Sequence, residues 1–186
     1  VKESLKINIG ACQIQNKALP HTLLYGFAGG GKTTLATAIS NEMGVSIEIT
    51  NGTTLSSIKS ILPYLMRVQN RSIFFIDEIH SCSKVVFEYL LTVMEQFKVV
   101  VGDMRYNIPC FTLIGATTNA GDIIKPMFDR FVIKYSLEPY SLDEIKTIIN
   151  LYGLKIDSDG LDLLAKTCKN VPRIAKNRLT FLTHYA

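Results

Sequence analysis

The cysteines of this chain are few and widely separated. Cys12, Cys82, Cys110 and Cys168 form no C-x-x-C pair, and no Cys/His cluster has the spacing of a zinc site. We therefore expect reduced, mostly buried thiols in a cytoplasmic protein, without zinc. The sequence also has no signal peptide and no run of about 18 apolar residues, so neither secretion nor a membrane partner is expected.

Charged residues are sparse, at 19% of the chain, and the net charge is only +4. This balance permits contact with nucleic acid without requiring it. The basic residues are unevenly distributed, because the stretch from residue 166 onward has no Asp or Glu. Its basic residues are Lys166, Lys169, Arg173, Lys176 and Arg178. Two interpretations stay open for this stretch: a solvated helix face, or a contact with phosphate or DNA.

One short segment carries a phosphate-binding pattern. The apolar strand 22–25 runs into Gly26-x-x-x-x-Gly31-Lys32-Thr33, and helical spacing follows. In this P-loop pattern the glycines let backbone N–H groups wrap phosphates, the lysine adds positive charge, and the Thr33 hydroxyl can ligate Mg²⁺. The alternative is a Gly-rich turn without a ligand. The predicted nucleotide-binding residues are Gly26, Ala28, Gly29, Gly30, Gly31, Lys32, Thr33 and Thr34.

A second apolar strand, 72–76, ends in two acids. Asp77 at the edge of a sheet is suited to hold Mg²⁺, directly or through water. Glu78 is suited to orient or deprotonate an attacking water. The alternative is a strand that simply ends in a polar loop. His80 follows in Asp-Glu-Ile-His, and we favour a structural role for it over a relay between nucleotide and DNA.

Three further positions are candidates for the catalytic site. The strand 111–115 leads into Thr118 and Asn119, either of which could sense a γ-phosphate, with Thr118 preferred. Arg130 could reach a neighbouring subunit's nucleotide, or instead pair with Asp129. Arg173 opens the last helix, where the helix dipole favours acids, so a phosphate partner is indicated.

Strands alternate with helices as far as about residue 137, which predicts a parallel sheet. Further strands are expected at 46–50 and 132–135, a hairpin at 98–108, and helices at 1–16, 84–96 and from about Thr54, where Pro63 should kink or end the helix. Within 84–96, Val85, Tyr89 and Val93 are expected to face inward. Beyond Pro139, amphipathic helices are expected at 141–151, 158–168 and 172–184.

These observations predict an α/β fold in two parts. Residues 1–137 should form a P-loop NTPase core with three αβα layers and a five-stranded parallel sheet. Residues 138–186 should form a small, all-helical lid. We find no internal repeat and no low-complexity stretch.

Together the motifs resemble the AAA+ ATPases, most closely the RuvB family. The resemblance covers nearly the whole chain and includes the segments 23–26, 31–36, 41–44, 75–80, 111–118, 129–131 and 172–175. It implies that Lys32 and Thr33 are Walker A residues, and that Asp77 and Glu78 are Walker B residues. It further implies that Thr118 is sensor 1, Arg130 the arginine finger and Arg173 sensor 2.

The resemblance implies a function as well: Mg²⁺-dependent ATP hydrolysis in a hexameric ring that drives branch migration or remodelling of DNA in recombination or repair. The alternative is an ATP-switched loader or adaptor acting on a protein partner without moving along DNA. A degenerate nucleotide binder is disfavoured, because Lys32, Asp77 and Glu78 are all intact.

Some features depart from the family. Phe27-Ala28 stands where RuvB proteins usually carry Pro-Pro, which predicts a looser loop, and Phe128 stands where the family often has Arg. The 98–108 hairpin is shorter than the RuvB insertion that contacts RuvA, so a RuvA-like partner is not expected. The adenine-binding segment and the DNA-gripping winged helix of the family are not in this sequence. We therefore expect a shortened form of a longer protein or a minimal relative, such as one from a phage or mobile element.

Overall fold

The computed structural model describes residues 2–154 and 156–185, and these form two units. The first unit contains the chain up to Gly26 together with Lys32–Ser136. The second unit contains Phe27–Gly31 and the chain from Leu137 onward. The turn of the P-loop therefore groups with the C-terminal helices. Lys32, which directly follows that turn, belongs to the first unit.

A five-stranded sheet forms the centre of the first unit, with the strand order β2-β3-β6-β1-β7. The strands are β1 (Thr22–Gly26), β2 (Ile47–Asn51), β3 (Ile73–Asp77), β6 (Thr112–Thr117) and β7 (Ile133–Leu137). The pairs β2–β3, β3–β6 and β6–β1 are parallel. All six residues of β6 are buried, as expected for the central strand of a sheet covered on both faces. The predicted five-stranded parallel sheet is confirmed.

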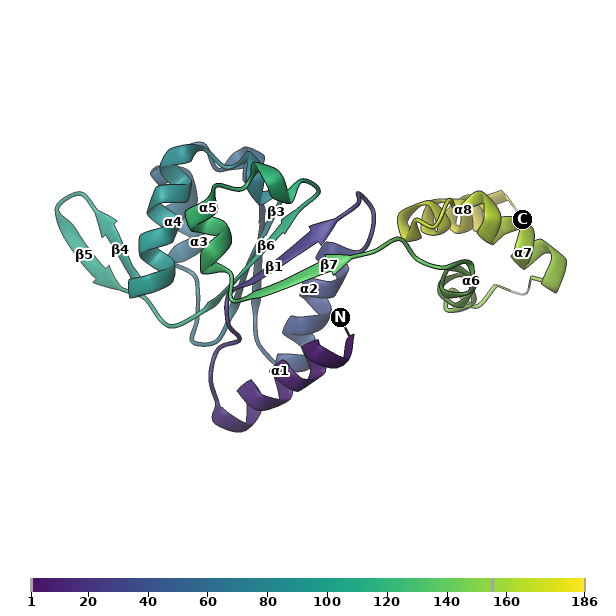
Figure 1. Ribbon diagram of the computed structural model, residues 1–186, viewed down its shortest axis with the longest axis horizontal. Coiled ribbons are helices and arrows are strands. Elements are labelled where there is room, and N and C mark those ends of the chain that lie inside the picture. The colour runs from purple at the N-terminus through teal and green to yellow at the C-terminus, as the bar shows by residue number, and fades with distance from the viewer. Residues whose placement is uncertain (1, 155, 186) are drawn as a thin grey trace. The chain divides into compact units, whose positions relative to one another are not determined.

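Helices cover both faces of this sheet (Figure 1). The helices α1 and α2 lie on one side, and α3, α4 and α5 lie on the other. This division follows from right-handed crossovers, because the chain moves across the sheet in one direction after β1 and in the opposite direction after β2, β3 and β6. The helices are α1 (Lys2–Gln15), α2 (Lys32–Met43), α3 (Ile58–Leu65), α4 (Lys84–Gln96) and α5 (Lys125–Arg130).

The helix expected from about Thr54 begins later, at Ile58. Asn51 explains the difference, because its side chain accepts a hydrogen bond from the backbone N–H of Thr53 and starts a short 3₁₀ turn instead. Ser57 and Ser60 then form a capping box for α3. Pro63 lies inside α3, which ends two residues later. Val1, which the first expected helix included, lies outside the described residues.

The predicted hairpin and the helix before it are both present. The strands β4 (Lys98–Val101) and β5 (Met104–Asn107) pair antiparallel and project from the end of α4 (Figure 1). One detail of α4 was predicted wrongly, because Val85 is 53% exposed. The buried stripe of α4 is instead formed by Val86, Phe87, Leu90, Val93 and Met94.

The second unit has its own small core. The helices α6 (Leu142–Asn150), α7 (Ser158–Thr167) and α8 (Pro172–Tyr185) bury Ile145, Ile149, Ala165, Cys168, Ala175 and Leu179 together. Capping explains two of the helix starts: Ser141 and Glu144 form a capping box for α6, and Asp157 caps α7. The three expected amphipathic helices are confirmed.

The cysteines are all free, as expected. Burial raises the pKa of the Cys82 thiol to about 12, which keeps this thiol protonated and unreactive. The expectation of mostly buried thiols holds for Cys82 and Cys168, whereas Cys110 is exposed and Cys12 is partly exposed. Across the described ranges, no helix is both long and apolar enough to cross a membrane.

His21, directly before β1, links β6 and α4 of the first unit. Its Nδ1 accepts a hydrogen bond of 2.9 Å from the backbone N–H of Leu113, so the proton lies on Nε2, which contacts the Met94 carbonyl oxygen at 3.2 Å. The imidazole also packs against the rings of Phe97 and Phe111. Burial lowers the pKa of His21, and the hydrogen bond with Met94 only partly opposes this effect. The fold therefore requires the neutral imidazole.

We predict that His21 makes the fold acid-sensitive. Below the ordinary histidine pKa of 6.5 the unfolded chain takes up a proton that the folded chain excludes, so stability falls with decreasing pH. The loss approaches about 1.4 kcal/mol per pH unit for this one group. Urea unfolding measures the free energy of unfolding at pH 7 and at pH 5. The difference between these two free energies should be smaller for His21→Gln than for wild type. Replacement of the exposed His184 by Gln is the control and should leave this pH dependence as in wild type. The same pH dependence in His21→Gln and wild type would contradict the role of His21.

Candidate functional site

The carboxyl ends of β1 and β3 bring the two predicted magnesium ligands together. Thr33 follows β1 at the start of α2, and its Oγ1 donates a hydrogen bond of 3.4 Å to Asp77 Oδ2 at the end of β3. The Lys32 side chain is buried, and its Nζ donates to the Gly26 carbonyl oxygen at 2.9 Å. A hydroxyl, a carboxylate and an ammonium group therefore gather at one edge of the sheet.

The chemistry of these donors fits Mg²⁺. This ion is usually held by one or two carboxylates, waters and substrate phosphates. Thr33 and Asp77 supply two hard oxygen donors that already converge. No group of three or more His, Cys, Asp or Glu side chains within residues 2–154 and 156–185 could hold a metal. Two converging protein donors suit an ion whose other ligands are waters and the phosphates of a nucleotide.

Glu78 and Thr118, predicted as separate candidates, are in direct contact. Thr118 donates to Glu78 Oε2 twice, from its hydroxyl at 3.0 Å and from its backbone N–H at 3.2 Å. Glu78 itself has a left-handed backbone with φ 45°, which is uncommon for a residue with a side chain. Asn119 does not compete for this position, because its side chain donates to Asp122 Oδ2.

His80 also lies close to the Glu78 carboxylate, and it contacts the Thr117 hydroxyl. Its Nδ1 lies 2.8 Å from Thr117 Oγ1 and 3.3 Å from Glu78 Oε2. The Thr117 hydroxyl also accepts the backbone N–H of Asn119, which fixes the turn after β6. The sequence favoured a structural role for His80, and these contacts agree with a residue that holds Glu78 and Thr117 in place. Thr117 was not predicted, because the candidates at the end of this strand were Thr118 and Asn119.

The turn of the P-loop is braced within the second unit. Gly29 has φ +79°, and a Cβ atom added there would lie 2.9 Å from Val171 Cγ1 and 3.1 Å from Arg173 Cβ. The Tyr140 hydroxyl donates to the Gly30 carbonyl oxygen at 3.3 Å. Burial, and then the nearby Glu144 carboxylate, raise the pKa of Tyr140, so its hydroxyl remains a donor. Arg173 therefore starts α8 directly beside the P-loop turn.

Phe27 also packs into this turn. A Cβ atom added at Gly30 would lie 3.0 Å from the Phe27 ring, and the Gly30 N–H points to the Phe27 carbonyl oxygen at 3.4 Å. The sequence predicted a looser loop, because Phe27-Ala28 replaces two prolines. The structure reveals a compensation that the sequence did not indicate, since the aromatic ring fills space against the glycine.

Arg130 makes an ion pair that the sequence did not foresee. Its Nη2 contacts Glu95 Oε1 on α4, and no ion pair with Asp129 occurs among the described residues. Both partners remain about half exposed, with 44% and 42% of their side-chain surfaces accessible. The next residue, Phe131, is fully buried and packs against Gly115 of β6. Arg130 therefore lies on the surface beside a firmly anchored residue.

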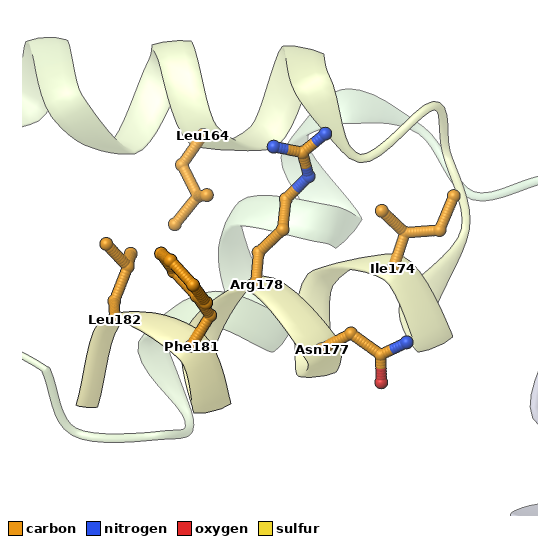
Figure 2. Close-up of a pocket in the computed structure, with 6 residues that line it drawn as sticks. All are labelled: Leu164, Ile174, Asn177, Arg178, Phe181 and Leu182. Carbon is orange, nitrogen blue, oxygen red and sulfur yellow. The ribbon is translucent and has the colours of Figure 1, made fainter. Parts of the chain in front are cut away.

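The basic stretch at the end of the chain is exposed, as a solvated helix face would be. All five basic residues of this stretch are exposed: Lys166, Lys169, Arg173, Lys176 and Arg178. Arg178 borders a shallow apolar groove between α7 and α8 (Figure 2). There Leu164 from α7 points toward Phe181 and Leu182 from α8.

The fold and the strand-end residues together define the P-loop NTPase fold. Comparison with known proteins identifies the family of the chain. The family model described as the Holliday junction DNA helicase RuvB P-loop domain matches residues 1–137. The chain therefore belongs to the RuvB family, whose ATPases are of the AAA+ class.

Individual relatives agree with this assignment. A Holliday junction branch migration complex subunit RuvB from Prochlorococcus marinus (strain MIT 9515) is 41% identical over 198 aligned positions, covering 100% of this chain and 56% of that protein. The structure of the Thermotoga maritima RuvB Holliday junction branch migration motor is 33% identical with a TM-score of 0.86, over 98% of this chain and 62% of that one. A mutant of the same motor gives a TM-score of 0.88. The chain thus spans less than two thirds of these relatives.

We predict that Gly29→Ala weakens nucleotide binding. The added Cβ meets Val171 and Arg173 in a left-handed backbone, and strain of this kind costs about 1–3 kcal/mol. Binding of a fluorescent ATP analogue should weaken roughly tenfold or more. Gly10→Ala is the matched control, because Gly10 lies in α1 with nothing within 4 Å of the new atom. Unchanged affinity in Gly29→Ala would show that the turn does not hold the nucleotide.

Proposed function

We propose that this chain binds ATP with Mg²⁺ and hydrolyses it. The observation that carries the proposal is the pairing of Thr33 with Asp77 at 3.4 Å beside a buried Lys32, with Glu78 and Thr118 on the neighbouring strand ends. The phosphates would be held by the residues of the P-loop. These are Gly26, Ala28, Gly29, Gly30, Gly31, Lys32, Thr33 and Thr34.

Each catalytic side chain then has a defined task. Lys32 would exchange the Gly26 carbonyl oxygen for the β- and γ-phosphate oxygens, which carry more negative charge. Thr33 and Asp77 would hold Mg²⁺, which when bound neutralises charge on those oxygens. Glu78 would orient or deprotonate the attacking water. Because Thr118 and His80 both contact Glu78 Oε2, the Oε1 atom is the one left to meet that water.

Two arginines would complete the site. Arg173 lies beside Gly29 at the start of α8, which supports a role as a sensor of the phosphates held by that turn. Arg130 would act on the nucleotide of a neighbouring copy of the chain, as an arginine finger supplied in trans. This role requires an oligomer, and we propose the hexameric ring that the family resemblance implies.

The biological role that we propose is a RuvB-like motor that remodels or migrates branched DNA in recombination or repair. The support is the family membership and the names of the relatives, which describe a Holliday junction motor. A motor of this kind would work in the cytoplasm, where ATP and cellular DNA meet.

One observation favours a second function, an ATP-switched loader or adaptor that acts on a protein. The hairpin exposes Val100, Val101, Met104 and Tyr106, and Met104 is 60% accessible. Apolar side chains gathered on a projecting element are typical of a protein-binding surface. A RuvA-like partner remains unexpected for the shorter hairpin, so a partner of this kind would be a different protein.

We predict that two variants separate binding from hydrolysis. Lys32→Ala should lose nucleotide binding, because the buried ammonium group is the main positive charge at the sheet edge. Glu78→Gln should bind ATP with nearly wild-type affinity but release phosphate at least about 100-fold more slowly, since the amide cannot take up a proton. Calorimetry and a phosphate-release assay measure the two properties. Tight ATP binding by Lys32→Ala would refute the P-loop assignment.

The motor and adaptor functions predict different responses to DNA. Four-way-junction DNA should raise the rate of ATP hydrolysis several-fold if the chain acts on DNA directly. A linear duplex of the same length is the control for non-specific charge effects, and added salt should weaken both responses. An ATPase rate that stays the same with and without junction DNA would favour the adaptor.

A further inference from the structure

Glu95 meets Arg130 from a different element of the fold. It lies in the last turn of α4, whereas Arg130 ends the six-residue helix α5. Their ion pair is exposed on both sides, so it contributes little to stability. Asp129, adjacent in sequence, is exposed and makes no ion pair among the described residues. Because the Glu95–Arg130 ion pair adds little stability, we looked for its use in the direction that it gives the Arg130 side chain.

The residues next to Arg130 anchor its backbone and do not compete for Glu95. Phe131 is buried against Gly115, which fixes the backbone next to the arginine. Lys134 does not compete for Glu95, because its Nζ donates to the Phe131 carbonyl oxygen and lies over the Phe128 ring. Glu95 therefore gives the guanidinium an ion-pair partner that favours one direction. This carboxylate contacts Nη2, and the other N–H donors of the planar group remain to meet a phosphate.

We propose that Glu95 is a positioning residue for Arg130, holding the guanidinium in the direction in which it reaches the nucleotide of a neighbouring copy. The inference rests on the proposed role of Arg130 in trans. An arginine held in advance loses less conformational freedom when it binds the γ-phosphate, so the benefit appears in the rate of hydrolysis. Glu95 lies in the last turn of α4, the end of the helix far from the carboxyl end of β3 that carries Asp77, so ATP binding should not depend on it.

The test uses mixed oligomers with one productive type of site. Glu78→Gln chains cannot hydrolyse ATP but supply Arg130, and Arg130→Ala chains can hydrolyse ATP only with an arginine from a neighbour. Mixing the two should restore hydrolysis. Adding Glu95→Ala to the Glu78→Gln chain should then lower kcat of the mixture roughly two- to fivefold, the effect expected of an exposed ion pair, without changing KM for ATP. Adding it to the Arg130→Ala chain should change neither value.

Two controls exclude a general effect on folding. Glu88→Ala removes another exposed acid from α4, one that makes no ion pair in the described part of the chain, and should have no effect on either chain. Glu95→Gln keeps an acceptor for the guanidinium and should restore most of kcat.

The possible outcomes are distinct. No hydrolysis in the parent mixture would overturn the trans role of Arg130, and this inference with it. Restored hydrolysis that is insensitive to Glu95→Ala would overturn the positioning role alone. An equal loss from Glu95→Ala in either chain would also overturn it, because the effect would then not act through Arg130.

Discussion

The parallel pairing of β3 with β6 is the constraint on which the rest of the site depends. Its register places Ile76 beside Gly115, so the residues that follow each strand leave the sheet at the same edge. Glu78 can therefore reach Thr118, and His80 can reach Thr117. The pairing of β1 with β6 on the other side brings the P-loop strand to the same edge. A shift of one residue in either pairing would turn these side chains to opposite faces and separate them.

A strained residue, Glu78, lies at the carboxyl edge of the sheet. Glu78 adopts a left-handed backbone, and its carbonyl group approaches Gly52 so closely that no side chain could fit there. Such strain persists only where the surroundings over-determine the conformation. Here the surroundings are Gly52, the hydrogen bond from the Glu78 N–H to Asp77 Oδ1, and the contacts of the carboxylate with Thr118 and His80. The acid proposed to activate water is thus held in advance and does not need to be ordered by substrate.

The sequence was sufficient where a local pattern decides the structure. Apolar runs identified the strands, and the P-loop and the Asp77-Glu78 pair predicted a nucleotide site at one edge of the sheet. The sequence-based prediction failed where one side chain determines where an element begins. Asn51 caps a 3₁₀ turn, so α3 begins later than expected. The prediction also failed where the partner is distant in the chain. Glu95 beside Arg130, Tyr140 beside Gly30 and the Phe27 ring beside Gly30 all depend on tertiary packing, which periodicity and spacing do not encode.

The proposed ATPase site is supported by contacts within the chain. The proposed cellular role is supported by family membership. The central claim is that the ends of three strands make an ATPase site that a second copy completes. Phosphate release from Mg²⁺-ATP by the purified chain, measured over a range of chain concentrations, tests it most directly. The account predicts Mg²⁺-dependent release whose rate per chain rises with concentration toward a plateau. Bound ATP without phosphate release at any concentration would contradict it.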